Sequence, residues 1–323
     1  MPQFFELPRE LRDMIYMEVI TWSRPLPALE DTEKANRWHR PWEPKSGLGD
    51  HGCAFSSKRA PSTCANFLAC NKQVYSEMQH TLERARRKGL LTARMDCIAR
   101  DEMHYFTWLS IPIVRTAGGP AHASKPAGML PTWASKYLSS SASPSTPPFP
   151  ATTTIDKLQL DIRVFPPSMT SPRAVESPRD RTSWAICAAL HHVFEHDASL
   201  IPVRSCPNRI AITEVILNVV SPPSVPVAPK LTTHYLVSPH SQAVLEVAKE
   251  NPAHPEVLAR ELVDVWNKLW SGDEFKARYY RGLLGGIGRV SVCVEGVVWR
   301  VREVGGELER GRAERRRIAA RMR

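Results

Sequence analysis

The sequence lacks any apolar run long enough to cross a membrane. Its longest uninterrupted stretch is about that of Ala185–Leu190, whereas a membrane-spanning helix needs about 18 or more apolar residues in succession. The first 25 residues also lack the apolar centre of a secretory signal peptide, because charged residues such as Glu6, Arg9 and Glu18 recur through them. These absences predict a soluble, intracellular protein in the cytoplasm, the nucleus or both.

Paired cysteines are missing as well. The seven cysteines are an odd number, and no C-x-x-C pair occurs among them. Scattered single thiols are typical of proteins that fold in reducing compartments. The cysteine pattern therefore argues against a disulfide framework and agrees with an intracellular location.

Catalytic signatures are absent except for one short match. The sequence has neither a G-x-S-x-G nor a Walker lysine motif, but His192, Glu195 and His196 match H-x-x-E-H, in which two histidines hold zinc and the glutamate activates water. No third ligand can be named, and both histidines are predicted to face solvent, opposite the apolar stripe of their helix. We therefore predict no catalytic residue, metal or cofactor, and treat a zinc hydrolase as a remote alternative.

Proline, in contrast, is abundant and clustered. The chain has 28 prolines in 323 residues, against a usual share of about 5%. Proline and glycine interrupt residues 24–63, and Gly, Ala, Ser, Thr and Pro dominate 116–154. We predict a long loop at 24–63 within a helical region 1–115, a Ser/Pro-rich linker at 116–154, a mixed domain at 155–304 and an Arg-rich tail at 305–323.

Two amphipathic helices are predicted in the first region. Apolar residues recur at three- and four-residue spacings over 8–22 and over 67–82, with Pro8 suited to a first helical turn and Asn66 as a possible cap. Because an isolated amphipathic helix is marginal in water, each should bury its stripe against the other. The predicted stripes are Leu11, Met14, Ile15, Val19 and Trp22, and Phe67, Cys70, Val74, Tyr75, Met78 and Leu82.

The second half of the chain alternates between strand and helix patterns. Residues 158–164 show the period-two alternation of a strand with one buried face. Two later apolar runs flank Glu295-Gly296, which indicates either a hairpin, the favoured interpretation, or a glycine bulge in one long strand. The expected strands are 158–164, 210–220, 290–294 and 297–301, and the expected helices are 183–197 and 255–270. The fold class predicted is α+β, a small N-terminal helical unit followed by a mixed strand and helix domain with proline-rich insertions.

Positive charge is concentrated in two segments. Of the net charge of +10, residues 58–94 carry eight Lys and Arg against two Glu, and residues 307–323 carry seven Arg against three Glu. Basic clusters can bind nucleic-acid phosphates, although cations at a helix end such as 84–88 also oppose the helix dipole favourably. A basic nuclear nucleic-acid-associated protein is therefore an alternative hypothesis. The tail is expected to be a localisation signal or a frayed terminus.

Two strings near the N-terminus resemble a known family. FFELPRELRDMIY at 4–16 and LACNKQVYSE at 68–77 are similar, in this order, to the opening helix and the partner helix of fungal F-box-like proteins. The resemblance implies a non-enzymatic protein-protein interaction module. In F-box proteins the small helical unit docks on the adaptor subunit of a cullin ubiquitin ligase, and the C-terminal region selects a target.

The resemblance also implies which residues would contact the partner. On the matching positions of this sequence, the docking surface would contain Leu7, Pro8, Leu11 and Ile15. The expected partner is a protein, the cullin-ligase adaptor subunit; nucleic acid is the less expected partner, and no membrane is expected. The triplet 10–12, ELR, also fits the first E-x-R motif of a related fungal family, although no convincing second copy follows.

Overall fold

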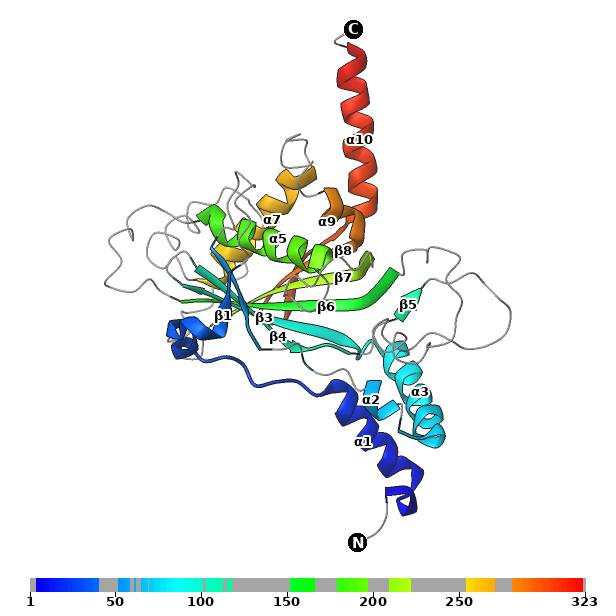
Figure 1. The fold of residues 1–323 in the computed structure, drawn as a ribbon. Coiled ribbons are helices and arrows are strands. Elements are labelled where there is room, and N and C mark those ends of the chain that lie inside the picture. Colours follow the sequence, from blue (N-terminus) through cyan, green and yellow to red (C-terminus); the bar gives the residue numbers. More distant parts are fainter. Residues whose placement is uncertain are drawn as a thin grey trace, which may run out of the picture.

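The computed structural model describes residues 4–40, 52–58, 61, 65–68, 70–100, 103–112, 115–117, 152–165, 179–196, 209–221, 254–270 and 281–321. These residues form a mixed sheet with helices on both sides (Figure 1), which confirms the predicted α+β class. The strands are β1 (Trp38–His39), β2 (Cys53–Ser56), β3 (Thr92–Arg100), β4 (Met103–Ser110), β5 (Arg115–Ala117), β6 (Thr152–Val164), β7 (Arg209–Val220), β8 (Ile287–Val294) and β9 (Val297–Glu303). The helices are α1 (Arg9–Thr21), α2 (Ala65–Leu68), α3 (Lys72–Arg87), α5 (Arg179–His196), α7 (Pro255–Trp270), α9 (Arg281–Gly286) and α10 (Val304–Arg321), with short 3-10 helices η1 (Phe4–Glu6), η2 (Leu29–Glu33) and η3 (Ala35–Arg37).

All the described strands belong to one sheet. Its order is β1-β2-β4-β3-β6-β7-β8-β9, with β5 beside β6. The central strands β3, β6, β7 and β8 are parallel, and antiparallel partners, β4 and β9, flank them. Because β3 pairs with β6 from Thr92↔Lys157 to Ala99↔Val164, the sheet combines strands from the 1–115 and the 155–304 regions.

The chain crossovers explain why the larger helices share one face of the sheet. The connections β6–α5–β7 and β7–α7–α9–β8 step across the sheet in the same direction, and right-handed crossovers then place successive helices on the same side. Accordingly, α5, α7 and α9 lie together above the sheet in Figure 1. The main core lies between these helices and the sheet, where Leu160, Leu217, Leu190 and Leu262 are all buried.

The opposite face of the sheet is polar and holds the N-terminal segment. Arg163 donates through Nε and Nη2 to the Asp96 carboxylate at 2.8 and 2.6 Å, and its Nη2 also donates to the Pro27 carbonyl at 2.9 Å. Burial raises the pKa of Asp96, and the Arg163 guanidinium opposes that rise. The Arg24 amide donates to the Leu109 carbonyl at 2.8 Å. These bonds tie the chain that follows α1 to the sheet.

The predicted hairpin near the C-terminus is confirmed. Glu295 and Gly296 both have positive φ, 49° and 77°, as a two-residue type I′ turn requires. The Glu295 amide donates to the Val219 carbonyl at 2.9 Å, and its carboxylate accepts from the Ser221 amide at 2.6 Å. The chain then continues as α10, so the prediction of a frayed tail is wrong: residues 304–321 are helical.

Other predicted elements have partly different boundaries. The expected strands at 158–164 and 210–220 and the helices at 183–197 and 255–270 correspond to β6, β7, α5 and α7. Within the described part of the predicted loop 24–63 lie η2, η3, β1 and β2, and β3 was not predicted. The helix cap is Asn71 rather than Asn66, because the Asn71 Oδ1 accepts from the Gln73 amide at 2.7 Å. Residues 118–151 of the predicted linker lie outside the described residues.

Candidate protein-docking surface

Helix α1 packs on α3 through a side that carries both polar and apolar residues. Its buried residues are Arg12, Tyr16 and Ile20. The prediction that the two helices pack together is confirmed by their shared buried cluster. Of the predicted stripe of α1, Val19 packs against this cluster, but the rest of the prediction is wrong: Leu11, Met14, Ile15 and Trp22 are exposed. An ionic contact between Arg12 and Glu77 decides which side of α1 faces α3.

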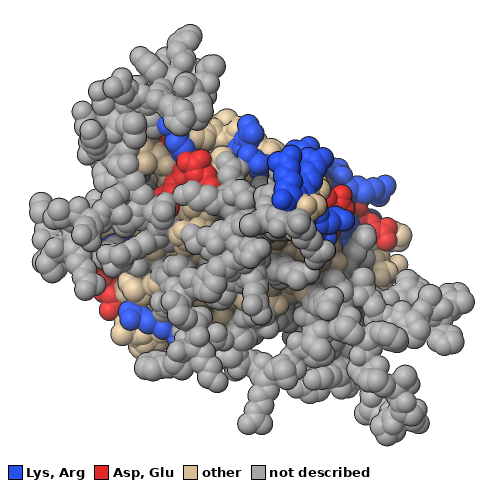
Figure 2. Space-filling view, turned by 90° about the horizontal axis from the view of Figure 1, so that it is seen from above, with Lys and Arg blue, Asp and Glu red and all other residues tan. Residues whose placement is uncertain are grey.

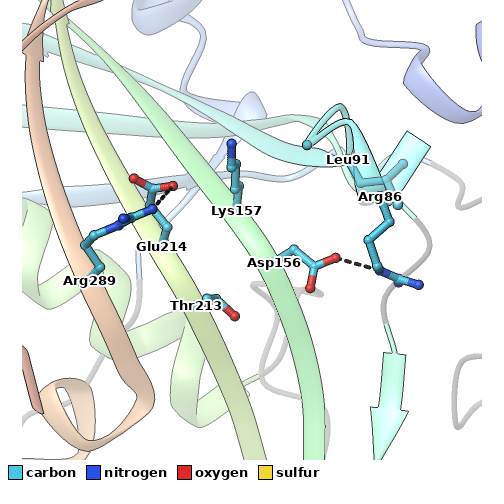
Figure 3. Close-up of a pocket in the computed structure, with 8 residues that line it drawn as sticks. Arg86, Leu91, Asp156, Lys157, Thr213, Glu214 and Arg289 are labelled. Carbon is cyan, nitrogen blue, oxygen red and sulfur yellow. Dashed lines mark hydrogen bonds and ion pairs between the residues drawn. The ribbon is translucent and has the colours of Figure 1, made fainter. Parts of the chain in front are cut away.

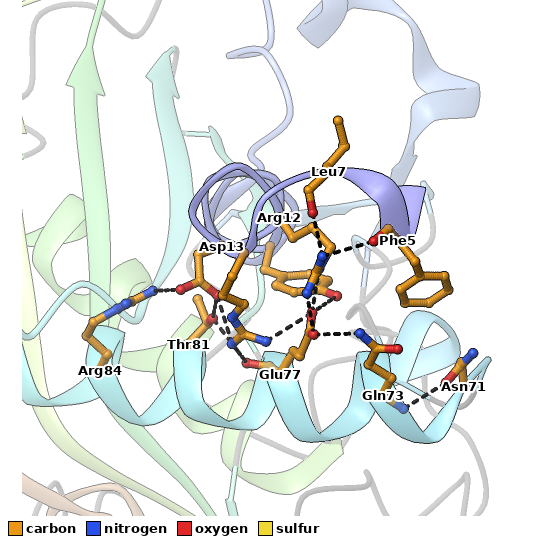
Figure 4. Close-up of polar contacts among 11 residues, drawn as sticks. Phe5, Leu7, Arg12, Asp13, Asn71, Gln73, Glu77, Thr81 and Arg84 are labelled. Atoms are coloured by element: carbon orange, nitrogen blue, oxygen red, sulfur yellow. Dashed lines mark hydrogen bonds and ion pairs between the residues drawn. The ribbon is translucent and has the colours of Figure 1, made fainter. Parts of the chain in front are cut away.

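This contact is centred on Glu77 of α3 (Figure 4). One carboxylate oxygen accepts from Arg12 Nη2 at 2.7 Å and from Gln73 Nε2 at 2.9 Å, and the other accepts from Arg12 Nε and from the Tyr16 hydroxyl, each at 2.9 Å. Arg9 adds an ion pair at 2.9 Å. A carboxylate bonded by two guanidinium nitrogens has a defined geometry. The Arg12–Glu77 pair therefore fixes the rotation of α1 about its axis.

Arg12 also fixes the chain that enters α1. Its Nη1 donates to the carbonyl oxygens of Leu7 and Phe5, at 2.5 and 3.3 Å. These carbonyls lie just before the first helical residue, where Pro8 has no polar side chain to cap the helix. One buried guanidinium thus joins the helix start, the helix body and the partner helix.

A second ionic contact lies beside the first. The Asp13 carboxylate accepts from the Thr81 hydroxyl and from Arg84 Nη2, both at 3.0 Å, and pairs with Arg9 at 2.9 Å. Partial burial by itself would raise the pKa of Asp13, but the hydrogen bonds from Arg84 and Thr81 and the charge of Arg9 hold this pKa below its ordinary value. Arg84, part of the basic segment 58–94, is therefore neutralised within the helix pair.

A small apolar cluster completes the interface. Tyr16 and Ile20 of α1 meet Val74, Met78 and Leu82 of α3. The prediction that these three α3 residues are buried is confirmed. Cys70 of the same predicted stripe is exposed, because it lies between the end of α2 and the start of α3. The cluster is smaller than the main core, so the polar contacts carry much of the specificity of this helix pair.

The other side of α1 carries several apolar residues that are exposed to solvent, with the exposed Glu18 among them. We call this side the α1 face; it consists of Leu7, Pro8, Leu11, Met14, Ile15 and Trp22. Leu11, Met14, Ile15 and Trp22 are 45%, 67%, 38% and 51% exposed, and the three- and four-residue spacings place them on one side of the helix. The four residues expected at a docking surface, Leu7, Pro8, Leu11 and Ile15, all belong to this face. Contiguous exposed apolar surface is a mark of an interaction site.

A hollow of about 170 Å³ lies between the end of α3 and the sheet (Figure 3). Its carboxylates are already paired: Asp156 with Arg86 at 2.8 Å, and Glu214 with Arg289 at 3.0 Å. Burial alone would raise the pKa of Glu214, but hydrogen bonds from Ser291 and Arg289 hold it below its ordinary value. The hollow is lined by Arg86, Gly89, Leu91, Asp156, Lys157, Thr213, Glu214 and Arg289.

The remaining cation of the hollow also has a structural role. A Cβ atom on Gly89 would lie 3.2 Å from Lys157 Nζ, and Gly89 has the positive φ of 67° that ends α3. The Lys157 ammonium is therefore at the C-terminal end of α3, where positive charge opposes the helix dipole favourably. The Arg86–Asp156 ion pair, at 2.8 Å, links the end of α3 to β6 beside this hollow.

The H-x-x-E-H match does not form a metal site in the described residues. His192 is 8% exposed, and its ring stacks on Phe55 with centroids 4.5 Å apart. The prediction that His192 faces solvent is therefore wrong, because α5 also packs against β2 on its histidine side. The side chains of Glu195 and His196 lie outside the described residues. Where side chains are described, no three His, Cys, Asp or Glu residues are grouped so that they could hold a metal.

Sequence reasoning missed Arg12 and Glu77, the residues that orient α1. Both lie inside the two strings that resemble F-box-like proteins. A signal was present, since each is one helical turn from a buried residue of its own helix: Tyr16 follows Arg12, and Thr81 follows Glu77, by four positions. Opposite charges at such positions indicate a buried pair only when the two helices are assumed to be neighbours.

Comparisons with protein-family models, with curated proteins and with solved structures found no match. No helix in the described ranges combines the length and the apolar character needed to cross a membrane.

Proposed function

We propose that this protein is a non-enzymatic interaction module whose α1 face docks on the adaptor subunit of a cullin ubiquitin ligase, in the manner of F-box-like proteins. One observation carries the proposal: α1 turns Arg12 inward and leaves Leu11, Met14 and Ile15 exposed to solvent. Burying a side chain the size of Leu or Met is favourable by about 1.5 to 3 kcal/mol. A protein partner that covers Leu11, Met14 and Ile15 would gain this free energy.

The ionic network supports such a role because it orders the surface before a partner binds. Arg12 is held by Glu77 and by the carbonyl of Leu7, so Leu7, Leu11 and Ile15 are presented in one arrangement. Interfaces that are ordered in advance lose less conformational entropy on association. This feature fits a docking helix better than a helix that merely covers a core.

The rest of the molecule fits the second part of the resemblance. α1 lies below the sheet in Figure 1, while α5, α7 and α10 lie above it. A partner bound at the α1 face would leave the surface on the far side of the sheet accessible. We infer that the sheet and its upper helices present the target-recruiting surface of a substrate-recruiting adaptor.

The proposal is tested by titrating the purified protein with purified cullin-ligase adaptor subunit. We expect binding by the unaltered chain and a loss of affinity of at least about 30-fold for Leu11→Asp, since central apolar contacts of an interface contribute about 2 kcal/mol or more each. Leu90→Asp is the matched control, because Leu90 is 49% exposed but lies beyond the end of α3. Its affinity should equal that of the unaltered chain.

Two results would overturn the proposal. One is the absence of binding by the unaltered chain at micromolar concentrations. The other is equal affinity of Leu11→Asp and Leu90→Asp, because the contact surface would then lie away from α1. Unfolding midpoints of both variants confirm that a lost interaction is not a lost fold.

A further inference from the structure

Strand β9 forms an edge of the sheet that is open to solvent. Among the described strands it pairs only with β8, in an antiparallel register that runs from Arg289↔Glu303 to Val294↔Val297. Val297, Val298 and Val301 are 67%, 58% and 45% exposed. An edge strand presents backbone N–H and C=O groups that can pair with a further strand. The β9 edge can therefore receive an extended segment.

The two faces of β9 differ in chemistry. Residues directly opposite each other in an antiparallel pair have their side chains on the same face. The opposite pairs are Arg300↔Val292, Arg302↔Val290, Val301↔Ser291 and Val298↔Cys293. Because Val290 and Val292 belong to the main core, Arg300 and Arg302 lie on the face that the helices cover. Val298 and Val301 lie on the other face, because the register of the pair shifts between Val292 and Cys293.

Helix α10 adds positive charge next to this edge. It begins at Val304, directly after β9, and residues 297–323 contain nine Arg against four Glu. Figure 2 looks down on the side from which α10 rises and shows Lys and Arg side chains gathered there. The exposed arginines of α10 are Arg310, Arg312, Arg316, Arg317 and Arg321. An acidic chain approaching β9 would meet a favourable potential.

We propose that the β9 edge binds an extended acidic segment of a partner protein by strand addition. Its acidic side chains lie on the face of Arg300 and Arg302, and its alternate, apolar side chains lie on the face of Val298 and Val301. Hydrogen bonds between the two backbones supply the affinity, as in other cases of strand addition. The alternation of acidic and apolar side chains supplies the selectivity for the bound segment. This site is distinct from the α1 face and does not depend on it.

Charge selects this occupant over a second copy of the chain. Two β9 strands paired with each other would bring arginines of both copies onto the same face, and like charges opposite one another destabilise a strand pair. Charged edge residues also prevent aggregation in this way. The same repulsion favours an acidic strand. A nucleic acid would neutralise the arginines but would leave the β9 backbone groups and Val298 and Val301 without partners.

The test measures binding of fluorescent seven-residue peptides, the length of β9, to the full chain by anisotropy. A peptide of alternating Val and Glu should bind, and one of alternating Val and Lys should not. Arg300→Glu combined with Arg302→Glu should weaken binding of the acidic peptide about tenfold or more. The matched control is Arg87→Glu with Lys88→Glu, at exposed positions where α3 ends, which changes the net charge equally and should leave the affinity unchanged.

Backbone pairing is tested separately with N-methylated peptides. A bound strand uses one of its two edges, so methylating alternate amides on one edge should abolish binding, and methylating the others should preserve it. Equal binding of both methylated peptides, or equal affinity of the two charge-reversed proteins, would overturn the proposal. Displacement of the acidic peptide by a short duplex DNA that binds more tightly would overturn it in favour of a nucleic-acid surface.

Discussion

Helices α5 and α1 bury opposite kinds of surface. α5 turns Ile186, Leu190 and Val193 into the main core, where each is at most 1% exposed. α1 turns Arg12 and Tyr16 inward and leaves Leu11 and Ile15 in solvent. Both helices have the same apolar periodicity in sequence, so periodicity alone does not tell which face is inside.

The difference follows from what each helix packs against. α5 lies on a sheet whose facing side chains are almost all apolar, and only apolar residues match such a surface without loss of hydrogen bonds. α1 lies on α3, whose facing residues include Glu77 and Thr81, so arginine, aspartate and a tyrosine hydroxyl are the matching residues. The apolar residues on the other side of α1, Leu11, Met14 and Ile15, are left exposed to solvent.

The largest expected effect comes from removing the carboxylate between α1 and α3. Glu77→Ala leaves the Arg12 guanidinium buried without its partner, and breaking a buried pair in this way costs about 3 to 5 kcal/mol. Urea unfolding of the variant measures the loss. Glu83→Ala, which removes an exposed carboxylate from the same helix, should cost less than about 0.5 kcal/mol. Similar costs for the two variants would show that Glu77 does not hold α1.

A matched pair of leucine truncations compares the two helices directly. Leu190→Ala in α5 should lower the free energy of unfolding by about 2 to 5 kcal/mol, because it opens a cavity in the main core. Leu11→Ala in α1 should change it by less than about 0.5 kcal/mol, because this side chain is already 45% exposed. A cost of about 2 kcal/mol or more for Leu11→Ala would show that Leu11 is buried in the fold, and would contradict an α1 orientation that leaves Leu11 in solvent.

The pH dependence of Asp13→Asn gives the smallest and most specific effect. The folded-state pKa of Asp13 is lowered from its ordinary value of 3.8. Asp13 therefore stabilises the fold above that value and loses this contribution as the pH falls through the folded-state pKa. Unfolding free energies of the two proteins should differ at about pH 6 and converge toward about pH 2.5. A difference that stays constant over this range would contradict the ionic role of Asp13.

Much of the fold could be predicted from local sequence. The alternation at 158–164 and the Glu295-Gly296 pair give β6 and the β8–β9 turn, since period-two burial and positive φ are local requirements. β3 was missed although Ala93, Met95 and Cys97 alternate with Arg94 and Asp96. Its residues have weak strand propensity, and its buried Asp96 is matched by Arg163, 67 positions away along the chain.

The residues of the α1 face were singled out by resemblance, and their orientation in the fold was not predictable from α1 alone. The spacing of Leu11 and Ile15 fits a buried stripe as well as an exposed interface. Only the residues of α3 show which of these two interpretations is right. Arg12 decides the outcome through Glu77, 65 positions away. The periodic pattern of either helix alone does not specify such a long-range ion pair, because the pair depends on the register between the two helices.

The most direct measurement is hydroxyl-radical footprinting of two methionines, with and without the cullin-ligase adaptor subunit. Met14 on the α1 face is 67% exposed and Met78 in the helix pair is fully buried. We predict that Met14 is oxidised in the free protein and protected at saturating adaptor, while Met78 stays unreactive in both. Equal oxidation of Met14 with and without the adaptor, or a reactive Met78 beside an unreactive Met14 in the free protein, would contradict the account.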